Sequence, residues 1–147
     1  MNEGPLDTTQ LDKSILTLQK SLELLLQSKR GSTEYEVFRN ATVKGFELTL
    51  ETSGKLLRRA LRAYMGSPRA VEGLTYKDLF RHAARHGLIT VEAVDRWFEY
   101  RDNRNTTAHD YGLAFAEETL RLLPAFIGDA RALQERLADA SNDSDEA

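Results

Sequence analysis

An arginine, a histidine and a tyrosine lie close together in the last third of the chain, in the pattern R-x4-H-x-Y. They are Arg104, His109 and Tyr111, with Asn105 directly after the arginine. Arginine is always charged and binds phosphate oxygens through its planar fork, and histidine can give or take a proton near neutral pH. Tyrosine adds a hydroxyl that can form hydrogen bonds or be modified. The pattern indicates either chemistry on a phosphate-bearing substrate or a solvated polar connection between two helices.

The spacing of Arg104 and His109 predicts a helix boundary between them. Side chains five residues apart on an unbroken helix point about 140° apart, so a shared site requires the helix to end or bend. Residues 105–107 are Asn, Thr and Thr, which suit a helix end because short polar side chains compete for backbone hydrogen bonds. We therefore expect Arg104 at the end of one helix and His109 at the start of the next.

A second group of candidate residues could bind a nucleotide or RNA. Trp97, Arg101 and Arg104 follow one another at spacings of four and three, which places them on one ridge of a helix. A tryptophan that only packs in the core explains the same spacing. Residues 55–104 carry 11 Lys and Arg against 6 Asp and Glu, a surplus that suits a phosphate-bearing partner or a solvated surface. Lys55 begins this basic segment, and we assign it to nucleotide binding together with Trp97 and Arg101.

Composition indicates a single domain without cysteine chemistry. The chain has 147 residues, 41% of them hydrophobic, and no cysteine, which excludes disulfides, thiolate metal sites and cysteine nucleophiles. His82 and His86 have the spacing of a metal-binding pair, but no third ligand accompanies them, so we predict neither a metal nor a cofactor. With no signal peptide and no membrane-length apolar run, we expect a soluble, cytoplasmic protein.

Hydrophobic periodicity predicts an all-α fold. Apolar residues recur at spacings of three and four in segments close to residues 9–30, 33–65, 91–104 and 112–137, with a shorter helix at 76–86. No run of residues resembles a strand, and 66–75 is predicted to be a loop. The expected architecture is an up-and-down antiparallel four-helix bundle with one additional short helix. It occupies 1–137, and the acidic residues 138–147 are expected to form a disordered tail.

Several local details of these helices are predicted as well. Ser32 or Thr33 is expected to cap the second helix, with Glu36 three residues beyond Thr33 as in a capping box, and Thr90 is expected to cap the fourth. Val91, Val94 and Phe98 are predicted to face the core. Pro124 should kink or break the last helix near residues 120–123, because proline removes a backbone hydrogen bond.

Three blocks of sequence resemble the HEPN superfamily, and in particular its branch of nucleotidyltransferase substrate-binding proteins. The resemblance extends over about residues 11–137. The blocks are Phe46-Glu47-Leu48-Thr49-Leu50-Glu51 with Lys55-Leu56-Leu57; Ser67-Pro68-Arg69 with Gly87-Leu88-Ile89 and Trp97; and Arg104-Asn105-Thr106-Thr107-Ala108-His109-Asp110-Tyr111. The last block is similar to that branch's RN-x-T-S-H-x-Y signature. One departure is Gly54, which stands where the branch usually has a tryptophan.

The resemblance implies a helical homodimer that works with a minimal nucleotidyltransferase (MNT). Many members of the superfamily are metal-independent ribonuclease toxins whose R-x4-H residues act at the dimer cleft. Carried over, Arg104 would stabilise charge on the phosphate, His109 would be the general acid and base, and Asn105 would orient them. Tyr111 would be modified when the partner neutralises the toxin.

Two other functions stay open at this point. The chain could be a non-catalytic subunit that presents a nucleotide or another substrate to the nucleotidyltransferase, as the name of the branch records. It could also be a helical dimer in which the motif is only structural. The sequence therefore leaves the enzyme assignment undecided between an endoribonuclease and a binding protein.

Overall fold

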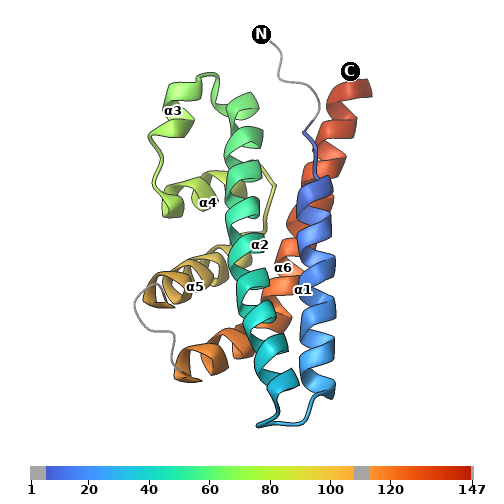
Figure 1. Ribbon diagram of the computed structural model, residues 1–147. Helices are drawn as coiled ribbons and strands as arrows, with labels where there is room; N and C mark the ends of the chain where they lie inside the picture. The colour runs from blue at the N-terminus through green and yellow to red at the C-terminus, as the bar shows by residue number, and fades with distance from the viewer. Residues whose placement is uncertain (1–5, 108–112, 147) are drawn as a thin grey trace.

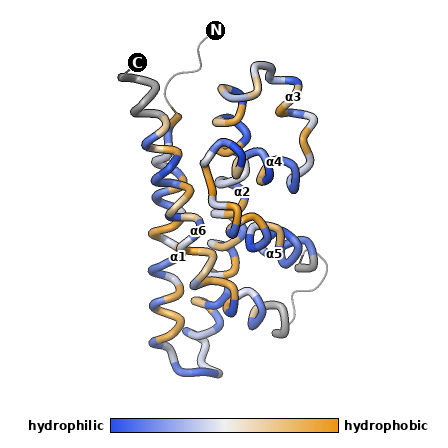
Figure 2. Tube along the Cα trace, turned by 180° about the vertical axis from the view of Figure 1, so that it is seen from behind, coloured by the Kyte–Doolittle hydropathy of each residue, from blue (hydrophilic) through white to orange (hydrophobic). Residues whose placement is uncertain are grey.

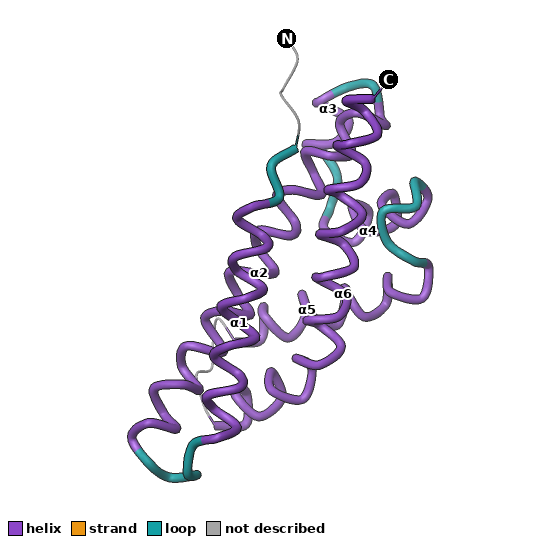
Figure 3. The backbone as a smooth tube through the Cα atoms, turned by 90° about the vertical axis from the view of Figure 1, so that its right-hand side faces the viewer, coloured by secondary structure: helices purple, strands orange, loops and turns teal. Residues whose placement is uncertain are grey.

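The computed structural model describes residues 6–107 and 113–146. This part of the chain folds into six helices and contains no strand. They are α1 (Thr9–Gln27), α2 (Thr33–Met65), α3 (Pro68–Glu72), α4 (Tyr76–Arg85), α5 (Val91–Thr107) and α6 (Leu113–Glu146). The predicted all-α bundle of four main helices is confirmed, with α4 as its additional short helix (Figures 1 and 3).

The long helices α1, α2 and α6 form the main stack, and α3, α4 and α5 lie on the side of α2 that faces away from α1 (Figure 1). The predicted apolar stripe of α1 is confirmed, because Leu11, Ile15, Leu18 and Leu25 are all buried. Hydrophobic positions recur along the length of these helices, as expected where each helix buries one stripe (Figure 2). Among the described helices, none is both long and apolar enough to cross a membrane.

Polar caps and glycines set the ends of several helices. Ser32 caps α2, since its side-chain oxygen accepts a hydrogen bond from the backbone N–H of Tyr35 at 3.1 Å. Of the two predicted caps, Ser32 is therefore the one observed, and a capping box starting at Thr33 does not form because Thr33 already lies inside the helix. At the other end of α2, Gly66 adopts a left-handed conformation with φ of 71°, a geometry that glycine reaches without strain.

The segment after Gly66 contains a helix that the sequence analysis did not predict. Helix α3 spans only Pro68–Glu72, with Pro68 in its first turn. Proline suits this position because its fixed φ matches the helix and its missing N–H would have had no helical partner. A single turn contains too few residues to show hydrophobic periodicity, which is why the sequence predicted a loop here.

The inward face of α5 differs from the predicted one. Thr90 does cap this helix, accepting a hydrogen bond from the N–H of Ala93 at 3.2 Å. The buried residues, however, are Ala93, Trp97 and Tyr100, whereas Val91 is 73% exposed. The prediction that Val91 belongs to the core is wrong. The ridge with Trp97 and Tyr100 is buried because two aromatic rings remove more apolar surface from water than the valines do.

Trp97 lies at the centre of an aromatic cluster that joins α5 to α2, α4 and α6. Its ring centroid is 4.9 Å from that of Phe80, 5.5 Å from Tyr100 and 5.9 Å from Phe126. Phe46 of α2 completes the cluster, with its ring 4.7 Å from Phe126. Most of these pairs meet edge to face, which the charge distribution of aromatic rings favours.

A buried polar contact adds to this packing between α5 and α6. Asp129 accepts two hydrogen bonds from the guanidinium of Arg96, at 2.8 and 2.9 Å, and one from the hydroxyl of Tyr100 at 2.6 Å. Its carboxylate is therefore satisfied on both oxygens, as a mostly buried charge requires. The contact fixes the rotation of α5, so that Tyr100 and Trp97 face inward.

Helix α6 is longer than predicted. It continues through Pro124 and past Leu137 to Glu146, so neither a break at the proline nor a helix end at Leu137 is observed. Figure 1 shows that α6 bends in its first half and then rises beside α1. Beyond Leu137 no glycine or proline stops the helix, and alanines at 138 and 140 favour it. Over 138–146 the structure thus shows a helix where the sequence predicted a disordered tail.

Candidate functional site

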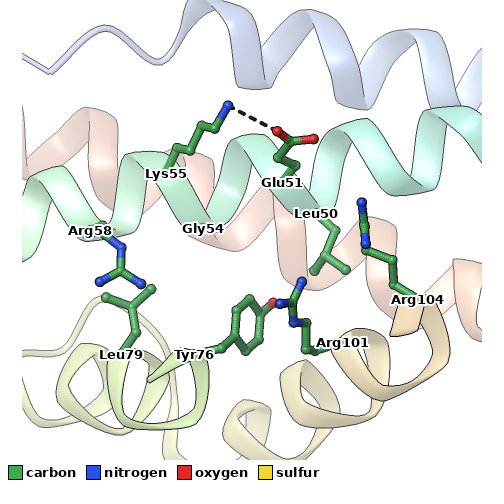
Figure 4. A pocket seen from close by; sticks show the side chains of 9 residues that line it. All are labelled: Leu50, Glu51, Gly54, Lys55, Arg58, Tyr76, Leu79, Arg101 and Arg104. Carbon is green, nitrogen blue, oxygen red and sulfur yellow. Dashed lines mark ion pairs between the residues drawn. The ribbon is translucent and has the colours of Figure 1, made fainter. Parts of the chain in front are cut away.

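A pocket of about 330 Å³ opens where α2, α4 and α5 meet (Figure 4). Side chains from all three helices line it: Leu50, Glu51, Gly54, Lys55 and Arg58 of α2, Tyr76 and Leu79 of α4, and Arg101 and Arg104 of α5. Three of the residues that we assigned from the sequence, Lys55, Arg101 and Arg104, are among them. The tertiary fold therefore brings together residues that lie far apart in the chain.

The pocket is strongly basic. Lys55, Arg58, Arg101 and Arg104 carry positive charges, and Glu51 is the single carboxylate among the described residues that line the pocket. Several like charges in one concave site raise the local concentration of anionic ligands and accelerate their binding. The lining also includes leucine side chains and one aromatic ring, as pockets for organic ligands generally do. Its composition suits an organic phosphate better than a bare anion.

Arg101 and Arg104 reach the pocket from the last turns of α5. Their spacing of three residues puts both on one face of the helix, and Figure 4 shows both side chains rising from α5 toward α2. Arg104 lies three residues before Thr107, the last described residue of α5, and the predicted helix boundary between Arg104 and His109 falls outside the described residues. Asn105 is exposed and does not line the pocket. His109 and Tyr111 lie outside the described residues.

Lys55 and Glu51 form an ion pair on the rim of the pocket. Their side chains are one helical turn apart, and the ammonium nitrogen lies 3.0 Å from the carboxylate oxygen. The hydrogen bond from Lys55 and its charge hold the pKa of Glu51 below its ordinary value, and Arg104 contributes in the same direction. Both side chains are largely exposed, so the pair contributes little to stability and its partners can turn to a ligand.

Arg58 and Tyr76 are pocket residues that the sequence analysis missed. The guanidinium of Arg58 donates hydrogen bonds to the carbonyls of Val71, at 2.7 Å, and of Leu74, at 3.4 Å, and so ties the segment before α4 to α2. Burial raises the pKa of Tyr76 far above its ordinary value, which keeps the phenol neutral. The spacing of Glu51, Lys55 and Arg58 by four and three was the available signal in the sequence.

Trp97 is the nucleotide-binding candidate that the structure does not place in the pocket. Its side chain is 0% exposed, and it packs among the aromatic rings of the core. The predicted ridge shared by Trp97, Arg101 and Arg104 is therefore divided. Arg101 and Arg104 lie beyond the edge of the core and reach the pocket, whereas Trp97, one turn earlier, points into the interior. Of the two explanations for this tryptophan, core packing is the one observed.

His82 lies on α4 and His86 caps its C-terminal end, and neither histidine lines the pocket. His86 stacks on Tyr64, with ring centroids 4.6 Å apart, and His82 is partly buried one turn earlier. In the described part of the chain, no three His, Cys, Asp or Glu side chains form a group that could hold a metal ion. The pair at 82 and 86 thus has no third ligand near it in this part of the structure.

Gly54 forms part of the pocket wall, and its replacement by alanine is expected to stabilise the protein. A methyl group there would lie 3.8 Å from Cε2 of Tyr76, an ordinary contact distance, and alanine is more favourable than glycine inside a helix by about 0.5–1 kcal/mol. Chemical denaturation of Gly54→Ala should show a gain of this size in the free energy of unfolding.

Gly45→Ala is the matched control. A methyl group there would lie only 3.3 Å from Cδ1 of Leu18, so the gain should be smaller or reversed. Equal gains at the two positions would contradict the role assigned to space around Gly54.

Comparison with known proteins gives consistent results over nearly the whole chain. The family described as nucleotidyltransferase substrate binding protein like matches residues 6–139. A protein of Haemophilus influenzae (strain Rd) described as probable ribonuclease HepT is 25% identical over 141 residues, covering 93% of this chain and 95% of that protein.

Two solved structures share the fold. One is a Haemophilus influenzae protein whose structure is described as revealing the fold of a substrate-binding domain of a nucleotidyltransferase. Its TM-score is 0.78, with 24% identity, and the match covers 89% of this chain and 98% of the other. The second is a protein of Thermus thermophilus, with a TM-score of 0.69 and 28% identity over 86% of this chain and 98% of the other. The first likeness supports the fold alone.

Proposed function

The chain belongs to the family of nucleotidyltransferase substrate-binding proteins, and from this premise we propose that it is a metal-independent ribonuclease controlled by a nucleotidyltransferase partner. The observation that carries the proposal is the position of Arg104, the arginine of the R-x4-H pattern, in a basic pocket with Lys55, Arg58 and Arg101. An arginine that served only to connect two helices would not need to lie among three other positively charged side chains.

The chemistry of RNA cleavage fits these residue types. Attack of a 2′-hydroxyl on the neighbouring phosphate needs a base that removes the hydroxyl proton, an acid that protonates the leaving oxygen, and positive charge for the phosphate oxygens. His109 supplies the proton transfers, and Arg104 stabilises the charge that develops on phosphate. Asn105, next to Arg104, orients the reacting groups. An imidazole can accept a proton as a base and donate one as an acid, so a histidine can serve both steps.

The relative described as a probable ribonuclease supports this interpretation, at 25% identity over almost the full length of both chains. The family name supports the second part of the proposal, a nucleotidyltransferase partner.

In this scheme the partner modifies Tyr111, two residues from His109, and so inactivates the site. The active unit is a homodimer in which the segment from Trp97 to Phe115 of each copy contributes to one cleft, and its place of action is the cytoplasm, where RNA is available.

A second function is favoured by the same family name. In that function the pocket binds a nucleotide and presents it to the nucleotidyltransferase without any chemistry of its own. The basic lining serves either purpose, because a substrate nucleotide and an RNA phosphate are both anionic.

RNA cleavage in the presence of a chelator decides between the two functions. We expect the purified chain to cut RNA in EDTA, because the proposed reaction uses no metal. Expression of the chain without the nucleotidyltransferase is expected to stop growth. Co-expression of the partner should restore growth, and mass spectrometry should then find a modified Tyr111. If the chain alone leaves RNA intact and growth unaffected, while it still binds a nucleotide, the substrate-binding function replaces the ribonuclease.

A further inference from the structure

Four side chains form a continuous series of contacts, called the stack below, from the core of the protein to the pocket. It begins at Trp97, whose ring lies 4.9 Å from that of Phe80 with an angle of 23° between the planes. Phe80 lies 4.7 Å from the ring of Tyr76, and the guanidinium carbon of Arg101 lies 5.0 Å from the centre of the Tyr76 ring. The last two members, Tyr76 and Arg101, line the pocket, and Figure 4 shows them next to each other.

The stack is built from two helices that interdigitate. Tyr76 and Phe80 are one turn apart on α4, and Trp97 and Arg101 are one turn apart on α5. Trp97 and Phe80 are fully buried, and Phe80, which packs on Trp97, contacts the Tyr76 ring from the side of the core. Arg101 is thereby held against an aromatic ring, an arrangement that attraction between a cation and the ring stabilises further. This contact with the Tyr76 ring positions the guanidinium at the pocket.

We propose that Arg101 is a stacking surface for a nucleobase, and that the pocket therefore recognises a nucleotide unit with its base and does not bind phosphate alone. This inference rests on the proposed function, in that it names the part of the RNA or nucleotide that the pocket recognises. The guanidinium carbon of Arg101 lies over the Tyr76 ring, 5.0 Å from its centre, and bases in single-stranded RNA commonly stack on arginine planes. Lys55, on the rim, then contacts the phosphate.

The other walls of the pocket fit the same ligand. Leu50 and Leu79 contribute apolar surface, and Gly54 leaves open the space that a larger side chain on α2 would fill. At about 330 Å³, the pocket is at the small end of the range for ligand sites, which suits one nucleotide unit. A site for phosphate alone would need neither the apolar walls nor the stack, because Lys55, Arg58 and Arg104 already supply positive charge.

The test compares a ligand with a base and the same ligand without one. Isothermal titration calorimetry would measure the affinity of the full chain for AMP and for ribose 5-phosphate, with the wild type and with Arg101→Lys. Lysine keeps the positive charge but lacks the plane. Arg81→Lys is the matched control, because Arg81 also lies over an aromatic ring, 5.2 Å from the centre of Phe98, yet does not line the pocket. Thermal unfolding would verify that each variant is folded.

We expect wild type to bind AMP at least about fivefold more tightly than ribose 5-phosphate, since stacking of one base contributes about 1–3 kcal/mol. Arg101→Lys should remove most of this preference and leave the affinity for ribose 5-phosphate nearly unchanged, and Arg81→Lys should alter neither affinity. CMP and UMP should bind within a few fold of AMP, because stacking tolerates any base.

Equal affinities of the wild type for AMP and ribose 5-phosphate, or no binding of AMP, would overturn the inference. So would an equal loss of both affinities in Arg101→Lys, which would make Arg101 a phosphate ligand. These outcomes are independent of the ribonuclease assay: a chain that leaves RNA uncut but prefers AMP through Arg101 would disprove the proposed reaction and retain the base-stacking surface.

Discussion

Replacement of His109 by alanine is expected to lower the rate of RNA cleavage by about 10²–10⁴-fold, the usual contribution of a positioned general acid or base. Alanine leaves the 2′-hydroxyl without a group that can take its proton near neutral pH. The positive charge of the pocket stays in place, since Arg104, Arg101 and Lys55 are unchanged. Binding of RNA should therefore persist while cleavage is lost, and single-turnover cleavage in EDTA would measure the rate.

The matched control for this substitution is His86→Ala. His86 is an exposed histidine that stacks on Tyr64, away from the pocket lining, and its loss should leave the cleavage rate within about twofold of wild type, as expected for a surface substitution outside the site. A lower rate in both variants would point to a general effect on the protein. Cleavage by His109→Ala at the wild-type rate would remove His109 from the reaction and, with it, the R-x4-H assignment.

The second large effect is expected in the core. Replacement of Trp97 by alanine should reduce the free energy of unfolding by about 3–5 kcal/mol, the range for truncation of a large buried aromatic side chain. Trp97 is 0% exposed and contacts rings from α4, α5 and α6, so the cavity would lie where these helices meet. Urea denaturation followed by circular dichroism would measure the loss.

Val91→Ala is the control on the same helix. Val91 is 73% exposed, and substitutions at such positions usually change stability by less than about 0.5 kcal/mol. Trp97→Phe should lie between the two variants, because phenylalanine keeps a ring in the cluster and removes an indole N–H that is buried without an acceptor. Similar stabilities for Trp97→Ala and Val91→Ala would contradict the burial of Trp97 and would restore it as a candidate ligand-binding residue.

The helices themselves could be predicted from the sequence because their signals are local. The apolar stripe of α1 and the end of α2 at Gly66 follow from side-chain periodicity and backbone preference within a few residues. The R-x4-H pattern is local as well, and it pointed to the end of α5, where Arg104 lines the basic pocket. Local signals fail where they are too short, as in the single turn of α3. At Pro124 they predicted a kink or a break, and α6 bends in its first half without breaking.

The orientation of α5 was decided by its neighbours. Val91, Val94 and Phe98 make one apolar face and Ala93, Trp97 and Tyr100 another, so periodicity alone leaves two choices. The rings of Phe80 and Phe126 and the carboxylate of Asp129, on other helices, select the second face. This choice buries Trp97 and, one turn later, brings Arg101 over Tyr76.

The sequence thus determined the chemical types of the site residues, and the tertiary structure brought these residues together in one pocket. Arg104, Lys55 and Arg101 could be identified because arginine and lysine suit phosphate wherever they stand. That they share a pocket with Glu51, Gly54 and Tyr76 depends on the packing of α4 and α5 against α2. No spacing in the chain encodes that contact, since it arises from side-chain packing between helices that are distant in sequence.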